Sequence, residues 1–454
     1  MTFLYFAYGS NLWPPQLRGR CPSAREIGSA VLKGWAPVYS KPSADGSAKL
    51  SIVEREDAEI HGALYEIDEA ERSQLDQAEP GYQPIVVDVT RRSGESSDAL
   101  TYQWTDGPVL RAPYDWYLSM VLMGARHHQL PDEYVASWLA VTTERDPLAG
   151  DIRPATSDDL PLMQRVLSYA LAHDGDRYSA HPGELGWWMF HGDPRFPDHL
   201  TFWLQGERGV LVIDSRRPEI NAFAAPGHPV TPLIEWAQRR LGGRGEVGWV
   251  SDDDAVLVSY LQTNGYEPVS TDRSYRWDLA SVEPPASRLP DGWVLRSLRG
   301  ESEANNRREA SHGAFRSTMD PVMHLDRYLG LMRSQVYVAV RDLVAVSPDG
   351  QIGSFMLWWP DKSGVAQIEP FGTHPDFQGR GVGTALIHHG LRMMREAGMR
   401  MARVITEDSR SDATAFYVAT GFEDVGAVRW WALPKNKRGQ PYVKSASQSA
   451  DISC

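Results

Sequence analysis

One stretch decides the fold of the C-terminal part of this chain: Phe377-Gln378-Gly379-Arg380-Gly381-Val382-Gly383-Thr384. It matches the pattern Q-x-x-G-x-G, with a predicted strand at 366–371 before it and apolar residues at helical spacing after it, up to a capping Gly398. Glycines leave backbone N–H groups bare, and the positive end of the helix dipole points at the same place. We therefore predict a phosphate-binding loop between a strand and a helix.

Length and composition limit the class of protein. A chain of 454 residues suggests about three domains. Hydrophobic residues make up 42% and charged residues 23%, and no apolar run approaches the ~18 residues of a membrane span, so no transmembrane anchor is expected. The N-terminus, Phe3-Leu4-Tyr5-Phe6-Ala7-Tyr8, reads as a strand rather than a signal peptide.

Charge and cysteine usage point to a compartment and a partner class. The two cysteines, Cys21 and Cys454, lie too far apart for a disulfide framework, which favours a reducing cytoplasm. The net charge of −13 argues against a nucleic-acid partner and favours a cationic small molecule. We expect small-molecule substrates.

The N-terminal segment has short, evenly spaced strand signals, as in a small barrel. These lie at 63–67, 85–89 and 100–104. Asp68 and Glu71 resemble a capping box, which predicts a short helix that ends just before Glu79.

A glycine and two small polar residues follow the first strand directly, in Tyr8-Gly9-Ser10-Asn11-Leu12. Such a loop can offer N–H donors to a carbonyl or carboxylate, although a plain strand-to-loop turn has the same pattern.

Three stretches carry a family resemblance when taken in order. They are Leu4 to Leu12, then Leu75-Asp76-Gln77-Ala78-Glu79, then Met123-Gly124-Ala125-Arg126 with Leu130-Pro131 and Glu133-Tyr134. Together they resemble the gamma-glutamylcyclotransferase family. Its members have a small mixed barrel and release 5-oxoproline from a gamma-glutamyl amine or amino acid.

The resemblance implies a reaction in which the substrate's own α-amino group attacks its γ-carbonyl. It assigns Glu79 as the acid and base, and Tyr102 as a pocket residue. In many family members a glycine follows the catalytic glutamate directly, whereas here Pro80-Gly81-Tyr82 follows Glu79. The identity of the amine part of the substrate therefore stays open. The residues that would hold the glutamyl group and its developing oxyanion are Tyr8, Gly9, Ser10 and Asn11.

The second segment follows a Pro/Gly hinge at 146–150 and contains a weak internal repeat. Residues 260–266 parallel 416–422, about 150 residues later, but Leu261 replaces a tyrosine there. Two prolines stand in 224–229, where a phosphate loop is expected, and proline has no N–H to donate. We interpret this copy as non-catalytic. Its tryptophans line an acceptor pocket or belong to the core: Trp187, Trp188 and Trp203.

The third segment has predicted strands at 293–296, 336–340 and 353–357, and then the glycine loop. With Tyr417-x-x-x-Gly421-Phe422 after the loop, and Glu369 to Pro375 before it, the segment resembles the GNAT superfamily of acetyl-CoA-dependent N-acyltransferases. The preceding copy makes it similar to a tandem GNAT protein.

The GNAT resemblance implies a central sheet whose strands splay apart. Pro370 lacks a donor and Gly372 weakens the strand, so pairing should break there and open a slot for the pantetheine arm. Gln378 would shape the loop. The implied acetyl-CoA site consists of Phe371, Thr373, Gln378, Gly379, Arg380, Gly381, Val382, Gly383 and Thr384.

Acetyl transfer needs a base for the amine and an acid for the leaving thiolate. Glu369 is the candidate base, and the alternative is a salt-bridged strand carboxylate. Tyr417 is the candidate acid by its spacing from Gly421. Arg410 stands where the family often has asparagine, and it stays unassigned.

Several histidines invite a metal-site interpretation. No matching cluster at ligand spacing accompanies His127-His128, His374 or His388-His389, so we expect no metal.

These observations predict an α+β fold, with a small mixed barrel at 1–146 and two GNAT-like α/β domains at 151–284 (degenerate) and 288–436 (catalytic), then a flexible tail at 437–454. The predicted function is bifunctional: cleavage of a gamma-glutamyl amide to 5-oxoproline plus a free amine, and acetylation of an amine from acetyl-CoA, with the released amine as one candidate acceptor. Two alternatives stay open. The N-terminal domain only binds gamma-glutamyl groups, or the GNAT part is a non-catalytic scaffold.

Overall fold

The computed structural model describes residues 1–107, 111–175, 180–191 and 199–434. The predicted tail at 437–454 lies outside them. By its contacts the chain divides into two compact units. The first contains Met1–Thr156 and short stretches of the region up to Arg217, and the second contains most of the rest. No helix in the described part of the chain has the length and apolar character needed to span a bilayer.

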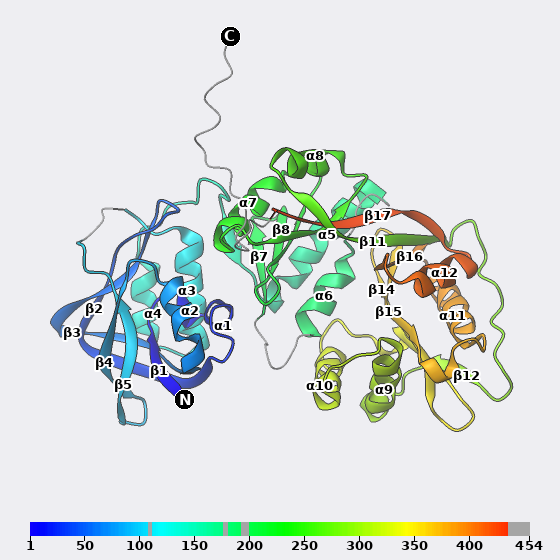
Figure 1. Cartoon of the computed structure of the whole chain (residues 1–454), viewed down its shortest axis with the longest axis horizontal. Helices are drawn as coiled ribbons and strands as arrows, with labels where there is room; N and C mark the ends of the chain where they lie inside the picture. The colour runs from blue at the N-terminus through cyan, green and yellow to red at the C-terminus, as the bar shows by residue number, and fades with distance from the viewer. Residues whose placement is uncertain (108–110, 176–179, 192–198, 435–454) are drawn as a thin grey trace, which may run out of the picture. The chain divides into compact units, whose positions relative to one another are not determined.

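The first unit is built on a closed five-stranded barrel with the strand order β1-β3-β2-β4-β5 (Figure 1). Its largest part is a long antiparallel hairpin whose register runs from Arg25↔Glu66 to Pro42↔Ala48. The predicted barrel is therefore correct, although the predicted strand at 63–67 is only the end of one arm of this hairpin. The strands are β1 (Thr2–Ala7), β2 (Arg25–Pro42), β3 (Ala48–Asp68), β4 (Gln83–Arg91) and β5 (Ser96–Gln103).

Helices and short 3-10 turns complete this unit. The predicted helix before Glu79 is present, but Asp68 makes no side-chain cap. Glu71 accepts hydrogen bonds from Ser23 instead, so the predicted capping box is wrong. The remaining elements of this unit are η1 (Ser10–Leu12), α1 (Pro14–Arg18), η2 (Glu69–Glu71), α2 (Arg72–Ala78), α3 (Asp115–His127), α4 (Asp132–Leu139), β6 (Ile152–Pro154) and β7 (Leu200–Gln205).

The second unit is organised around a large sheet that contains the order β12-β13-β14-β15-β16-β11-β17-β10-β9. Pairing is parallel between β9 and β10 and between β15 and β16, so each half repeats the same arrangement. The strands are β8 (Gly209–Asp214), β9 (Glu219–Ala224), β10 (Glu246–Ser251), β11 (Glu267–Asp278), β12 (Val294–Ser297), β13 (Asp342–Val346), β14 (Ile352–Pro360), β15 (Val365–Thr373), β16 (Met401–Glu407) and β17 (Glu423–Ala432).

Helices cover this sheet, and one predicted strand is absent. Residues 336–340 form a loop and the start of a 3-10 turn, and the strand begins at Asp342. Val338 and Val340 are exposed, so the β-branched pattern there reflects no buried face. The helices are η3 (Ser157–Asp159), α5 (Leu160–Asp174), α6 (Pro182–Phe190), α7 (Thr231–Arg240), α8 (Ala255–Thr263), η5 (Glu301–Glu303), α9 (Ala304–Ala314), α10 (Pro321–Met332), η6 (Ala339–Arg341), η7 (Pro375–Phe377), α11 (Val382–Glu396) and α12 (Ser411–Ala419).

The two repeated halves exchange a strand. Strand β11 belongs to the second segment of the chain, yet it lies between β16 and β17 of the third. Figure 1 shows green β11 beside red β17, and β17 in turn pairs with β10 of the second segment. Tyr275 and Trp277 of β11 therefore pack in one core with Leu386 and Leu391 of α11. Neither half has a complete sheet or core without the other.

This exchange predicts that the two halves unfold together. Trp277 is 5% exposed and packs edge-to-face on Phe422, at 5.6 Å between ring centroids. Trp277→Ala is expected to destabilise the second unit by about 3–5 kcal/mol in urea titrations. Hydrogen exchange should show β9 and β14 losing protection together. Val282→Ala, at a 48% exposed position, is the control, and a variant in which only β14 loses protection would contradict the shared core.

Candidate functional site

In the first unit, the loop after β1 is held tightly by buried tyrosines. The Tyr8 hydroxyl donates to the carbonyl oxygen of Tyr102 at 2.5 Å. A Cβ atom on Gly9 would lie 3.4 Å from the Tyr117 hydroxyl, so the backbone approaches that ring closely. The Tyr102 hydroxyl donates to Asp76 at 2.6 Å, which directs it toward that carboxylate. The sequence prediction of Tyr8, Gly9 and Tyr102 as site residues thus concerns groups that contact one another.

Glu79 lies at the C-terminal end of α2, as the sequence predicted, and belongs to a compact polar cluster. The Asn11 side-chain amide donates to Glu79 Oε1 at 3.0 Å and to the Tyr5 hydroxyl at 2.8 Å. Arg20 Nη1 donates to Glu79 Oε1 at 2.6 Å and to Asn11 Oδ1 at 2.9 Å. Sequence reasoning missed Arg20, because no motif marks an arginine in the turn after α1. Ser10, also predicted, starts the 3-10 turn beside Asn11.

The tyrosines around this cluster stay neutral at physiological pH. Burial raises the pKa of the Tyr117 hydroxyl to about 12, and burial followed by the charge of Glu79 raises the pKa of Tyr5 further. A neutral hydroxyl can donate a hydrogen bond to a developing negative charge. The cluster therefore surrounds the Glu79 carboxylate with one guanidinium and several neutral hydrogen-bond donors.

In the second unit, the predicted splay between strands is present. Parallel pairing between β15 and β16 joins Val365–Gln367 to Met401–Arg403 and goes no further, although both strands continue. Beyond Gln367, β15 pairs only with β14, where the register shifts between Met356 and Trp358. The gap opens into a cavity of about 750 Å³.

The glycine loop borders one end of this cavity. Gly379 and Gly381 have φ values of 73° and 77°, which glycine adopts without strain, and nothing would lie within 4 Å of a Cβ atom on either. Gln378 Nε2 donates to the carbonyl oxygen of Thr373 at 3.1 Å, so Gln378 does tie the loop to the strand. A Cβ atom on Gly383 would lie 2.6 Å from Thr373 Oγ1. Helix α11 therefore packs closely on β15 and presents its N-terminus to the cavity.

The other predicted loop residues also lie here. Phe371, Val382 and Thr384 line the cavity, and Phe371 stacks on Phe416 at 5.2 Å between centroids. The exposed Arg380 lies over the Phe377 ring at 5.6 Å.

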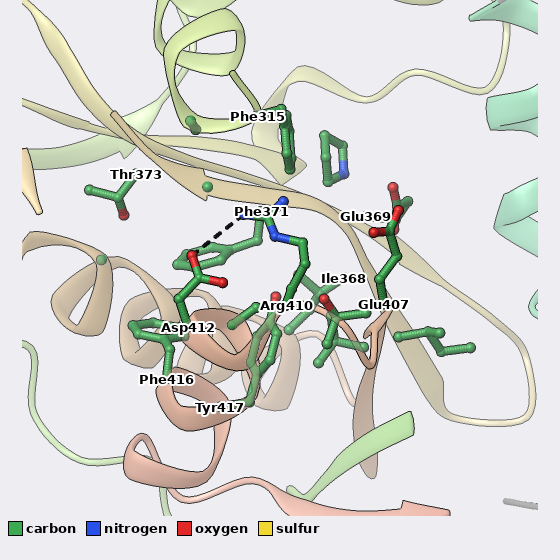
Figure 2. Close-up of a pocket in the computed structure, with 18 of the residues that line it drawn as sticks. Phe315, Ile368, Glu369, Phe371, Thr373, Glu407, Arg410, Asp412, Phe416 and Tyr417 are labelled. Carbon is green, nitrogen blue, oxygen red and sulfur yellow. Dashed lines mark ion pairs between the residues drawn. The ribbon is translucent and has the colours of Figure 1, made fainter. Parts of the chain in front are cut away.

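Glu369 and Tyr417 both line the cavity, from β15 and α12 respectively (Figure 2). Burial, followed by the charge of Asp272, raises the pKa of Glu369 to about 7. Burial, followed by the charge of Glu369, raises the pKa of the Tyr417 hydroxyl above its ordinary value. The pair therefore offers a carboxyl that titrates near neutrality and a neutral hydroxyl, as a base and an acid require. Arg410 lines the same cavity and pairs with Asp412 at 3.7 Å.

Carboxylates from the second segment add to this cavity. Glu184 of α6 is 3% exposed, and its Oε1 atom has no hydrogen-bond partner within the part of the chain that the structure describes. Burial, followed by the charge of Glu369, raises its pKa to about 8. Asp272 of β11 also lines the cavity, and burial with the charge of Glu407 raises its pKa to about 6. The sequence contained no signal for these two residues, because only tertiary packing of α6 and β11 brings them here.

The tryptophans divide between this cavity and the cores. Trp187 and Trp188 line the cavity together with Trp249, which the sequence analysis did not select. Trp203, the third predicted candidate, is fully buried and contacts Trp13 at 5.6 Å between centroids. Trp203 is therefore a core residue.

The histidine pair 127–128 has a partner that spacing did not reveal. Glu26 of β2 brings a carboxylate to them, and the three ligand atoms lie within 4.8 Å of one another. Glu26 already accepts a hydrogen bond from Arg18 at 2.9 Å and lies 2.9 Å from His127 Nε2. The group forms a polar network on the barrel.

Comparison with known proteins assigns a family to each part. The AIG2-like family profile matches residues 59–138, and the acetyltransferase (GNAT) family profile matches residues 309–422. Gamma-glutamylcyclotransferase of Bos taurus is 31% identical over 142 residues, which is 29% of this chain and 75% of the relative. Mycothiol acetyltransferase of Propionibacterium freudenreichii subsp. shermanii is 31% identical over 310 residues, which is 66% of this chain and 97% of the relative.

The chain belongs to the gamma-glutamylcyclotransferase and GNAT families. A solved tandem GNAT protein from the clavulanic acid biosynthesis pathway is 16% identical and has a TM-score of 0.45, with 63% of this chain and 99% of that chain covered. In this fusion protein, Glu79 lies in the gamma-glutamylcyclotransferase-type domain and the glycine loop in the GNAT domain.

GNAT acetyltransferases use acetyl-CoA, and the loop fits that group. Its open glycine N–H groups and the helix terminus suit a pyrophosphate, and the slot beyond Gln367 suits an extended arm.

Because α11 packs closely on β15, a side chain added at Gly383 is expected to disturb the glycine loop. Gly383→Val is expected to weaken CoA binding at least roughly 10-fold, because its side chain displaces Thr373 and the first turn of α11 that would hold the pyrophosphate. Isothermal titration calorimetry measures this. Gly398→Asn, at the other end of the same helix, is the control because asparagine tolerates its positive φ. Wild-type affinity in a folded Gly383→Val protein would place CoA elsewhere.

Proposed function

We propose that this fusion protein is a bifunctional enzyme. Its first domain cleaves a gamma-glutamyl amide to 5-oxoproline and a free amine, and its GNAT part transfers acetyl from acetyl-CoA to an amine. The observation that supports it best is that both parts present the chemical groups that their reactions need, Glu79 in its polar cluster and Glu369 with Tyr417 in the cavity.

In the first reaction the substrate supplies its own nucleophile. Glu79 accepts a proton from the α-amino group, the nitrogen attacks the γ-carbonyl carbon, and the protonated Glu79 returns the proton to the departing amine. The loop from Tyr8 to Asn11 stabilises the carbonyl oxygen as its charge develops. This reaction consumes no water and needs no metal ligand from the protein.

In the second reaction Glu369 accepts the proton of the acceptor amine, which attacks the thioester carbonyl. Tyr417 donates a proton to the departing CoA thiolate. The aromatic faces of Trp187, Trp188 and Trp249 favour a cationic acceptor amine. Mycothiol acetyltransferases are relatives of this part, so their acceptor is the first candidate to test.

The two reactions are joined in one chain, and we extend the proposal to their coupling. A tethered domain raises the local concentration of its product near the next active site. The amine that the first domain frees is then the acceptor for the second.

The test separates the two activities. Gamma-glutamyl amides are supplied with acetyl-CoA, and 5-oxoproline and free CoA are measured independently. Glu79→Gln is expected to lower 5-oxoproline release by roughly 10²–10⁴-fold while acetylation of a free amine continues, and Tyr417→Phe the reverse. The controls are Glu69→Gln, which changes an exposed carboxylate, and Tyr260→Phe. Tyr260 lies on α8, the helix of the second segment that corresponds to α12.

Three results would each remove one part of the proposal. Unchanged 5-oxoproline release by Glu79→Gln would displace the first active site. An absence of CoA release with every amine would favour a GNAT scaffold. Acetylation of added amines, but of none that the first domain releases, would remove the coupling alone.

The pKa of Glu369 predicts the pH dependence of acetylation. Because that pKa is raised to about 7, the carboxyl is protonated and inactive as a base below it. The kcat/KM value for acetyl transfer should therefore fall with unit slope as the pH decreases through about 7. Glu369→Gln should remove this limb together with most of the activity. Glu407→Gln, which changes an exposed carboxylate in the same cavity, should leave the limb in place.

A further inference from the structure

In the first domain, Arg20 forms an ion pair with Glu79, the proposed base. Arg20 Nη1 lies 2.6 Å from Glu79 Oε1, and the side chains are 25% and 15% exposed. Asn11 links them, since it accepts from Arg20 and donates to Glu79. The proposed base therefore lies beside a cation that its proton-transfer step does not use.

The guanidinium has an unused edge. Its hydrogen bonds to Asn11 and Glu79 both come from Nη1, and Nε and Nη2 have no hydrogen-bond partner among the described residues. Arginine presents five N–H donors in a planar fork that matches a carboxylate with two parallel hydrogen bonds. Arg20 therefore binds Glu79 through Nη1, and its free edge, formed by Nε and Nη2, is suited to a second carboxylate.

An α-amino acid carries an ammonium and a carboxylate on one carbon atom, and this pattern is complementary to a neighbouring carboxylate and guanidinium. We propose that Arg20 and Glu79 together bind the α-amino acid head of the glutamyl group. The free edge of Arg20 holds the α-carboxylate, and Glu79 receives the α-ammonium. This assignment rests on the proposed cyclotransferase function and names the part of the substrate that the site selects.

The arrangement places the reacting proton. Glu79 takes one proton from the α-ammonium and releases it to water. The resulting α-amine then bonds to the γ-carbon as Glu79 takes its second proton, and the bond from that carbon to the leaving amine breaks as Glu79 passes this proton to the amine. The α-carboxylate stays on Arg20 throughout.

Specificity follows from the same contacts. A gamma-glutamyl compound whose α-carboxyl is amidated has no charge to offer, and it leaves the free edge of Arg20 unpaired. Lys41 is the other cation whose charge reaches Glu79, and its ammonium lies 5.3 Å from the Tyr82 ring centroid. An ammonium is a point charge and cannot offer a carboxylate two parallel hydrogen bonds from one planar group. Lys41 is therefore the residue for comparison, and Arg20 is the residue expected to select substrates with an α-carboxylate.

The experiment compares γ-L-glutamyl-L-alanine with its α-carboxamide analogue. Wild-type protein is expected to prefer the α-carboxylate by roughly 10–100-fold in kcat/KM, as a charged hydrogen-bonded pair provides. In Arg20→Ala the KM for the carboxylate substrate should rise and the preference should fall below roughly threefold. Arg20→Lys should restore part of it, whereas Lys41→Ala and the surface variant Arg25→Ala should keep it.

The preference is a ratio within one preparation, so partial misfolding of a variant does not change it. The proposal is overturned if Arg20→Ala lowers the rates of both substrates equally, or if Lys41→Ala abolishes the preference. If wild-type protein releases 5-oxoproline from γ-L-glutamyl-L-alanine without preferring the carboxylate, the proposal also fails while the proposed function stands. If wild-type protein releases 5-oxoproline from no gamma-glutamyl amide, the proposed function fails first.

Discussion

The end of parallel pairing between β15 and β16 is the constraint on which the GNAT part depends. A sheet that stayed paired beyond Gln367 and Arg403 would have no opening for an extended cofactor. Strand β15 carries Glu369 just past this point, and the glycine loop follows a few residues later. The separation of two strands thus creates the cavity and places a carboxyl and a helix terminus on its walls.

Burial then determines the chemistry of that cavity. A carboxyl with full access to water would be ionised at neutral pH and would bind its proton weakly. In the cavity, desolvation and the nearby acidic groups raise the pKa values of Glu369 and Glu184 into the range of cellular pH. Near neutral pH these two carboxyls therefore hold their protons for much of the time. The first domain uses the opposite arrangement, in which a cation lies beside Glu79.

Local patterns predicted the parts of this structure that depend on local chemistry. The glycine loop, the helix with Gly398 at its end, the barrel strands and Glu79 at the end of α2 all follow from turn chemistry, periodicity and the family motifs. The failures have physical causes. The valines at 336–340 suggested a strand but are partly or fully exposed, and Glu71 bonds Ser23, distant in sequence, rather than its own helix. Arg20, Glu184 and Asp272 were missed because only tertiary contacts bring them to the sites.

The exchange of β11 and β17 has a consequence for how this chain can change over evolutionary time. The second segment has prolines in its loop and a leucine where the third has Tyr417, so the two segments differ at the positions expected to bind phosphate and donate a proton. Strand β11 of the second segment is constrained all the same, because Tyr275 and Trp277 fill the core of the neighbouring half. Natural selection on either segment therefore acts on both, and deleting the second would remove a strand from the middle of the shared sheet.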